Sequence, residues 1–231
     1  MATAISPSQL PAQPAGNVPE AAARIELNGP APDFEANTTH GTLRLSEYGK
    51  GKWVILFSHP ADFTPVCTTE FVEFSRVLPE MDRRGVRLLG VSVDSIYSHI
   101  AWVRNVEDKF GVKIGFPVVA DRDQKVARLY GMIHAPSSDT ATVRCVYFID
   151  PKQTVRAMIY YPMQVGRSFE EILRVVDALQ TVDREQVATP ANWKPGQDVI
   201  VPAPVTAQAA DERAHAKNLD VKDWYFAQKH T

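Results

Sequence analysis

The sequence is poor in cysteine, with two cysteines, Cys67 and Cys145, among 231 residues. Two cysteines without regular spacing argue against a disulfide framework and for a reducing compartment, so we expect the cytoplasm. The charge is nearly balanced, with 25 basic and 27 acidic side chains, so no basic surface for nucleic acid or an anionic membrane is expected. No apolar run approaches the roughly 18 residues of a membrane span. These absences leave an ordinary globular composition with 45% apolar residues.

Several familiar site patterns are also absent from the sequence. Gly49 and Gly51 lack a third glycine and a following helix start, so no nucleotide-binding loop is expected. The histidines show no metal-ligand spacing, so no metal site is expected. Residues 1–24 contain no continuous apolar core, so we expect a mobile tail there rather than a secretory signal.

Five apolar segments are typical of strands. They cover residues 53–57, 86–93, 116–119, 142–149 and 155–161. The last two are joined by a four-residue turn, which predicts a hairpin and therefore a mixed rather than a wholly parallel sheet. Strand–helix–strand units followed by a hairpin and a final helix predict an α/β fold in which helices flank the central sheet.

Apolar residues at helical spacing follow three good N-cap residues, Thr64, Ser95 and Ser168. Ser168 and Glu171 form a capping box ahead of a strongly amphipathic segment. In the helix after Ser95, we expect the apolar face to consist of Ile96, Ile100, Val103 and Phe110. From Pro190 onward, prolines are expected to break regular structure, and the closing aromatics Trp224-Tyr225-Phe226 should dock on the main domain or on a partner subunit.

The most informative stretch runs from His59 to Glu70, directly after the strand at 53–57. Thr64 suits the N-cap and Pro65 the first helical position, which puts Cys67 in the first turn of a helix. Free backbone N–H groups and the positive end of the helix dipole favour an anion there. Because the thiolate is the nucleophilic form of cysteine, we predict that Cys67 is reactive. The alternative is a small buried hydrophobic residue.

Pro60, Thr64 and Cys67 match the proline-x-x-x-threonine-x-x-cysteine motif of the peroxiredoxins, and the stretch from Ser58 to Glu70 resembles their one-cysteine subfamily. The resemblance implies a thioredoxin-like peroxidase domain over 25–185 and a smaller C-terminal domain or dimerisation arm over 186–231. It implies reduction of hydrogen peroxide and organic hydroperoxides through a Cys67 sulfenic acid, an external thiol reductant, and no metal, haem or flavin cofactor. A homodimer is expected, with a higher oligomer left open.

Arg144 is the second residue on which this interpretation depends. It lies in an apolar strand, and arginine is rarely buried without an anionic partner. We predict that it donates hydrogen bonds to the Cys67 thiolate and to substrate oxygen, as the resemblance also implies; a strand-end arginine reaching solvent is the alternative. Cys145 follows it directly and should face the other side of the sheet, which makes it a core residue rather than a resolving cysteine.

Five further residues are candidates for the same site. Thr64 would stabilise developing charge together with Arg144, and Pro60 would cover the thiolate. His59 could reach the thiolate or the peroxide, or be a structural histidine. Glu70 could orient an arginine or be a solvated helix residue. Arg167 resembles a second family arginine near the site, and an ordinary surface arginine is the alternative.

Two other functions compete with the peroxidase. A thioredoxin-type disulfide oxidoreductase needs two cysteines three positions apart, but Thr64 and Glu70 occupy the places around Cys67. A non-enzymatic chaperone or peroxide-signalling protein is the alternative from another class.

Overall fold

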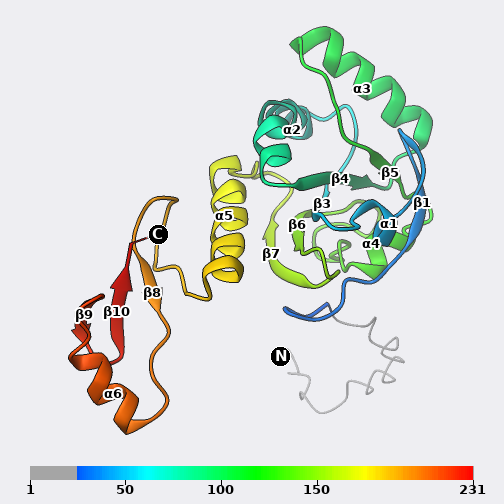
Figure 1. Cartoon of the computed structure of the whole chain (residues 1–231). Coiled ribbons are helices and arrows are strands. Elements are labelled where there is room, and N and C mark those ends of the chain that lie inside the picture. The colour runs from blue at the N-terminus through cyan, green and yellow to red at the C-terminus, as the bar shows by residue number, and fades with distance from the viewer. Residues whose placement is uncertain (1–24, 231) are drawn as a thin grey trace, which may run out of the picture.

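The computed structural model describes residues 25–230, so the predicted tail over 1–24 lies outside the described residues. A seven-stranded sheet with the order β2-β1-β5-β4-β3-β6-β7 forms the centre of the protein (Figure 1). Its strands are β1 (Glu35–Thr38), β2 (Gly41–Arg44), β3 (Trp53–Ser58), β4 (Val86–Ser92), β5 (Val118–Ala120), β6 (Arg144–Ile149) and β7 (Val155–Tyr161). Strands β3, β4 and β5 are parallel, whereas β6 and β7 form an antiparallel hairpin beside β3. The predicted mixed sheet is confirmed.

Helices cover both faces of this sheet and enclose two hydrophobic clusters. The helices are α1 (Leu45–Tyr48), α2 (Pro65–Arg83), α3 (Ile96–Phe110), α4 (Lys125–Leu129) and α5 (Phe169–Glu185). Strand β3 shows why two clusters form, because successive side chains point to opposite faces. Ile55 and Phe57 pack with residues of α2, α3 and α5, and Val54 and Leu56 pack with residues of α1 and α4. Among residues 25–230, no helix combines the length and apolar character needed to cross a membrane.

Helix α2 begins where the sequence predicts. Thr64 has extended backbone angles at the N-cap, and Pro65 is the first helical residue. The Thr64 side chain makes no capping bond, however, because its hydroxyl donates to the carbonyl of Ala61 at 2.8 Å. The helix ends at Arg83 with Arg84 as its C-cap, and Gly85 follows with φ of 65°, a left-handed conformation that glycine adopts without a steric penalty.

Ser95 caps helix α3 as predicted, and its side chain accepts a hydrogen bond from the backbone of Ser98. Its predicted apolar face is wrong, because Ile100 and Phe110 are 37% and 50% exposed. The fully buried residues are His99, Trp102 and Val106. Periodicity of aliphatic residues missed this face because His99 and Trp102 carry polar atoms, which find hydrogen-bond partners inside the fold.

The C-terminal region is more regular than its prolines suggest. It contains β8 (Val199–Val201), α6 (Ala207–Ala214), β9 (Asp220–Asp223) and β10 (Phe226–Lys229), and the strands form a second sheet with the order β8-β10-β9. This sheet projects from the main body beyond α5 (Figure 1). A small buried cluster of Ala178, Val187, Trp193 and Val199 joins the two parts. The boundary between the peroxidase domain over 25–185 and the C-terminal region over 186–231 stays a prediction.

Candidate active site

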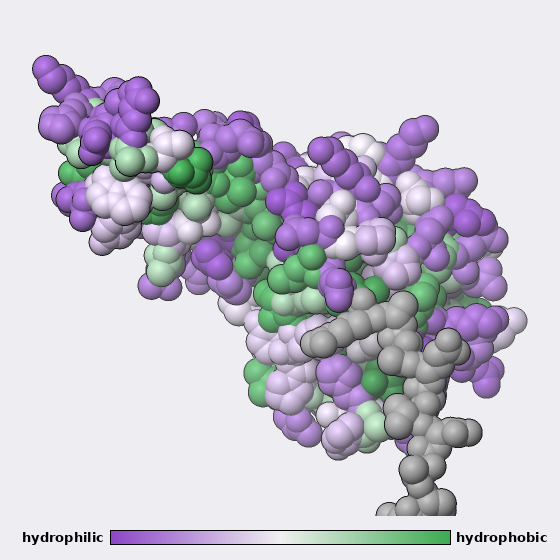
Figure 2. Space-filling model, turned by 90° about the horizontal axis from the view of Figure 1, so that it is seen from below, coloured by the Kyte–Doolittle hydropathy of each residue, from purple (hydrophilic) through white to green (hydrophobic). Residues whose placement is uncertain are grey.

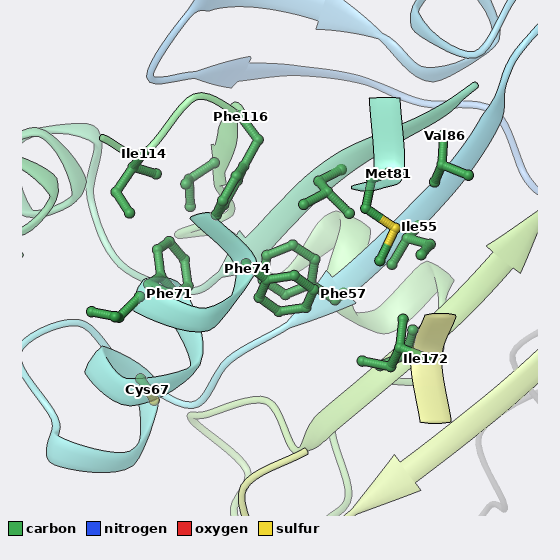
Figure 3. Close-up of a cluster of buried hydrophobic side chains, with 14 of the residues drawn as sticks. Ile55, Phe57, Cys67, Phe71, Phe74, Met81, Val86, Ile114, Phe116 and Ile172 are labelled. Carbon is green, nitrogen blue, oxygen red and sulfur yellow. The ribbon is translucent and has the colours of Figure 1, made fainter. Parts of the chain in front are cut away.

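Cys67 lies in the first turn of α2 with its side chain fully buried. Figure 3 shows it at the N-terminal end of a run of aromatic rings that continues through Phe71, Phe74 and Phe57. Phe57 and Phe74 are stacked with their ring centroids 3.9 Å apart, which fixes α2 against strand β3. The sheet and the aromatic contacts therefore hold the thiol at a defined position beside the free N–H groups of the helix start.

Arg144 is the first residue of β6 and reaches the sulfur of Cys67 from the neighbouring strand. Its Nη1 lies 3.3 Å from Cys67 Sγ, and the same nitrogen lies 2.6 Å from Glu70 Oε2. Its Nε donates to the carbonyl of Met163 at 2.8 Å. Only 2% of Arg144 is exposed. The carbonyl of Met163 and the carboxylate of Glu70 hold its guanidinium on two sides, with Nη1 directed at the thiol.

Glu70 connects Arg144 to a second buried arginine, Arg167. Arg167 donates to Glu70 through its backbone N–H and Nε, both at 2.9 Å to Oε1, and through Nη2 at 2.6 Å to Oε2. The Nη1 of Arg167 donates to the carbonyls of Ser58 and Cys145. Two guanidinium groups and one carboxylate leave one positive charge in surplus. This surplus charge lies beside the sulfur of Cys67.

Cys145 belongs to the hydrophobic cluster on the opposite face of the sheet from Cys67. Its Sγ lies 3.0 Å from Ser58 Oγ. Burial raises the pKa of the Cys145 thiol to about 11, although the hydrogen bond with Ser58 works in the other direction. Cys145 is therefore a protonated core thiol at neutral pH.

His59, Pro60 and Thr64 lie in the loop between β3 and α2. His59 and Pro60 are buried, and Thr64 is partly buried. The Nε2 of His59 donates to Asp62 Oδ1 at 2.9 Å, so this ring bonds to a neighbour in its own loop rather than to Cys67. Burial lowers the pKa of His59, against the opposing effect of Asp62.

Asp62 and His99 were not recognised as site residues from the sequence. Asp62 accepts hydrogen bonds from His59 and from Nδ1 of His99, the latter at 2.9 Å, and it is 7% exposed. Burial acts to raise the pKa of Asp62, but the hydrogen bonds from the two histidines hold it well below its usual range. Asp62 lies inside the stretch that resembles one-cysteine peroxiredoxins, and this position is the sequence feature that could have identified it as a site residue. His99 lies 37 residues further along the chain, so no local spacing links it to Asp62.

The same three side chains are the group that could hold a metal ion within residues 25–230. One ligand atom of each of His59, Asp62 and His99 lies within 4.8 Å of the others. These atoms bond to one another in the observed arrangement, and a metal ion would have to replace those hydrogen bonds.

The sequence matches two family descriptions in different parts of the chain. Residues 27–158 match the AhpC/TSA family, and residues 178–217 match the C-terminal domain of 1-Cys peroxiredoxin. Peroxiredoxin 2 of Caldanaerobacter subterraneus is 50% identical over 205 residues, which cover 88% of this chain and 92% of that protein. A peroxiredoxin of Aquifex aeolicus is 52% identical over 213 residues, which cover 88% of this chain and 96% of that protein.

Solved structures show the same similarity at the level of the fold. One match is a structure of a yeast mitochondrial 1-Cys peroxiredoxin that concerns its thiol resolving mechanism via glutathione/thioredoxin systems. The TM-score is 0.81 and the sequence identity 40%, and the match covers 90% of this chain and 100% of that chain. A cysteine-to-serine mutant of peroxiredoxin 6 of Arenicola marina matches with a TM-score of 0.80 and 35% identity, covering 89% and 98%. The predicted thioredoxin-like fold is confirmed. This chain therefore belongs to the peroxiredoxins of the AhpC/TSA family, and its two matched regions together mark it as a peroxiredoxin of the one-cysteine type.

Proposed function

We propose that Cys67 is the peroxide-reducing nucleophile of this thiol-dependent peroxidase. The observation that carries the proposal is the guanidinium of Arg144, whose Nη1 lies 3.3 Å from Cys67 Sγ inside a buried cluster with surplus positive charge. A buried thiol of purely structural use would not require a buried arginine beside it. The non-enzymatic chaperone or signalling alternative has no comparable support in this geometry.

The reaction transfers one oxygen atom from the peroxide to sulfur. The Cys67 thiolate donates an electron pair to the nearer peroxide oxygen, and the O–O bond breaks as the S–O bond forms. The leaving oxygen departs with the bonding electrons and takes a proton, which yields water or an alcohol beside a Cys67 sulfenic acid. Hydrogen peroxide and organic hydroperoxides share this O–O bond and are the proposed substrates.

Arg144 and Thr64 are proposed to stabilise the charge that develops on the two oxygens during this step. Thr64 lies at the start of the helix that carries Cys67, where its hydroxyl now donates to Ala61. Pro60 is proposed to cover the thiolate and exclude bulk water. Glu70 and Arg167 orient Arg144, and His59 is proposed to contact the bound peroxide.

An external thiol is proposed to reduce the sulfenic acid. Cys145 lies in the cluster on the other face of the sheet and stays protonated, so it is poorly placed to resolve Cys67. The thiol attacks the sulfenic sulfur and releases water, and a second thiol then frees Cys67 from the mixed disulfide. The yeast relative, whose structure concerns glutathione/thioredoxin systems, is consistent with such a reductant. Two free cysteine thiols also support a reducing compartment, and we propose the cytoplasm.

A homodimer is proposed from the surface of the C-terminal region. Trp224 and Tyr225 are 45% and 55% exposed in the single chain, so the main domain does not bury them. Figure 2 shows hydrophobic surface along the junction between the C-terminal sheet and the main body. Exposed aromatics of this kind are typical of protein interfaces, and a second copy of the chain is the proposed partner.

The experiment that tests the proposal compares two cysteine variants in a peroxide-consumption assay with a thiol reductant. Cys67→Ser should abolish turnover because no other ionised sulfur is available. Cys145→Ser should retain most of the activity, since Cys145 contributes only to the core. Comparable losses from both substitutions would contradict the assignment of Cys67 as the sole nucleophile.

A further inference from the structure

The loop that leads into the active-site helix is fixed at Asp62. The backbone N–H of Asp62 donates to Asp94 Oδ2 at 3.0 Å, which joins the loop to the turn that follows strand β4. The Asp62 side chain accepts hydrogen bonds from His59 within the loop and from His99 on α3. Both imidazoles are fully buried. We call His59, Asp62 and His99 the Asp62 network.

Hydrogen-bond chemistry places the protons in this network. An ionised carboxylate only accepts, so His59 donates through Nε2 and His99 donates through Nδ1. The second nitrogen of His99, Nε2, lies 3.1 Å from the carbonyl oxygen of Val119, which also only accepts. His99 therefore donates from both nitrogens and pairs as a cation with Asp62. His59 is left with an unprotonated Nδ1, which has no hydrogen-bond partner among the described residues although it is buried.

His59 lies on the same face of the sheet as Cys67. Phe57 packs in the cluster that contains Cys67, whereas the side chain of Ser58 bonds to Cys145 on the other face. Alternation along an extended chain returns His59 to the Cys67 face. Its ring contacts Phe71, one helical turn after Cys67, at a centroid distance of 4.9 Å, and Trp102 at 5.1 Å. Trp102 in turn donates to Thr68, the residue after Cys67.

We propose that Asp62 and His99 are positioning residues that hold His59 with Nε2 protonated and with the Nδ1 lone pair available on the Cys67 side of the sheet. Asp62 fixes the tautomer, and His99 fixes Asp62 as a carboxylate from the side of α3. The free lone pair can accept the hydrogen bond of a hydroperoxide O–H, which orients the O–O bond toward the sulfur. This role in the reaction rests on the proposed function; the tautomer of His59 does not.

The test combines histidine-ring NMR with peroxide kinetics on the full chain. Long-range proton–nitrogen correlation spectra of protein carrying ¹⁵N-labelled histidine should show wild-type His59 protonated at Nε2 alone and His99 protonated at both nitrogens. In Asp62→Asn the amide can itself donate to Nε2, so His59 should lose its fixed tautomer. The second-order rate constant for hydrogen peroxide should then fall at least tenfold.

Asp94→Asn is the matched control, because Asp94 bonds to neither imidazole and the amide oxygen of asparagine can still accept from the backbone of Asp62. It should leave the His59 tautomer unchanged and the rate constant within twofold of wild type. If Asp62→Asn does not fold, His99→Gln replaces it. This variant replaces the imidazole that donates to Asp62 with an uncharged amide, and it should lower the rate constant at least threefold and add signals of the second His59 tautomer.

A wild-type His59 protonated at Nδ1 overturns the proposal. So does a folded Asp62→Asn or His99→Gln variant that keeps both the tautomer and the rate constant. A variant with lower stability, a slower reaction and an unchanged tautomer also overturns it, because that result describes a purely structural residue. If wild-type protein reduces no peroxide, the proposed function fails, while the spectra still decide whether Asp62 fixes His59.

Discussion

Replacing Glu70 with glutamine should cost the protein a large part of its stability as well as its activity. The Glu70 carboxylate accepts four hydrogen bonds, two on Oε1 from Arg167 and one on Oε2 from each of Arg144 and Arg167. Glutamine offers one acceptor oxygen, so at least two of these bonds are lost and its NH₂ group faces guanidinium donors. Hydrogen bonds to charged groups contribute about 1.5–3 kcal/mol each, which gives a loss of about 3–6 kcal/mol.

Removing one partner of a buried ion pair costs about 3–5 kcal/mol, which overlaps this range. Urea unfolding followed by circular dichroism measures the stability loss, and stopped-flow kinetics with hydrogen peroxide should show a rate constant at least tenfold below wild type. Glu73→Gln is the control, because Glu73 lies on the same helix but its side chain is 41% exposed and, among residues 25–230, pairs only with Arg76. That change should stay within about 0.5 kcal/mol of wild type. A Glu70→Gln protein within 1 kcal/mol of wild type, with unchanged kinetics, would refute this reading of the buried cluster.

Arg144→Lys keeps the charge but loses the planar fork, so stopped-flow kinetics should show at least a tenfold slower reaction with peroxide, equivalent to about 1.4 kcal/mol; a wild-type rate would place Arg144 outside the reacting site. Deleting the residues after Thr189 should weaken or abolish the dimer in analytical ultracentrifugation, and an unchanged tight dimer would rule out the C-terminal contact. Burial lowers the pKa of His59, although Asp62 offsets part of this effect. Burial acts to raise the pKa of Asp62, but the hydrogen bonds from His59 and His99 lower it by more. In acid the unfolded chain therefore binds more protons than the folded chain, so the free energy of unfolding should fall as pH drops below about 6.5 and again below about 3.8. A free energy of unfolding that stays constant over this range would contradict the prediction.

Much of the fold could be predicted because its strongest signals are local. The apolar run of β3, the proline at the start of α2 and the glycine after it each specify structure within a few residues. Strand β1, which lies between β2 and β5, was missed because Glu35–Thr38 carries no apolar alternation. The C-terminal sheet was missed for a related reason, since its strands are three or four residues long and β8 lies among prolines. Such strands are specified by their partners rather than by their own pattern.

The candidate site divides in the same way. Cys67 could be recognised from its position at a helix start. For Glu70 the sequence left two alternatives open, an orienting partner of an arginine or a solvated helix residue, and in the structure Glu70 is buried and pairs with Arg144 and Arg167. The contacts of Arg167 with Ser58 and Cys145 could not be predicted, because they join residues 109 and 22 positions apart. His99 was missed because nothing in the sequence around it shows that the fold places Asp62 beside it. The catalytic roles of these residues stay predictions.

The most direct measurement of the central claim is a peroxide pulse without reductant, followed by blocking of free thiols and peptide mass spectrometry. Cys67 and Cys145 belong to clusters on opposite faces of the sheet, and the pKa of Cys145 is raised to about 11 by burial. Excess peroxide should therefore convert Cys67 to sulfinic and sulfonic acid, while Cys145 is recovered as a blocked thiol. A dominant Cys67–Cys145 disulfide, or oxidation of Cys145 with Cys67 intact, would contradict the one-cysteine mechanism.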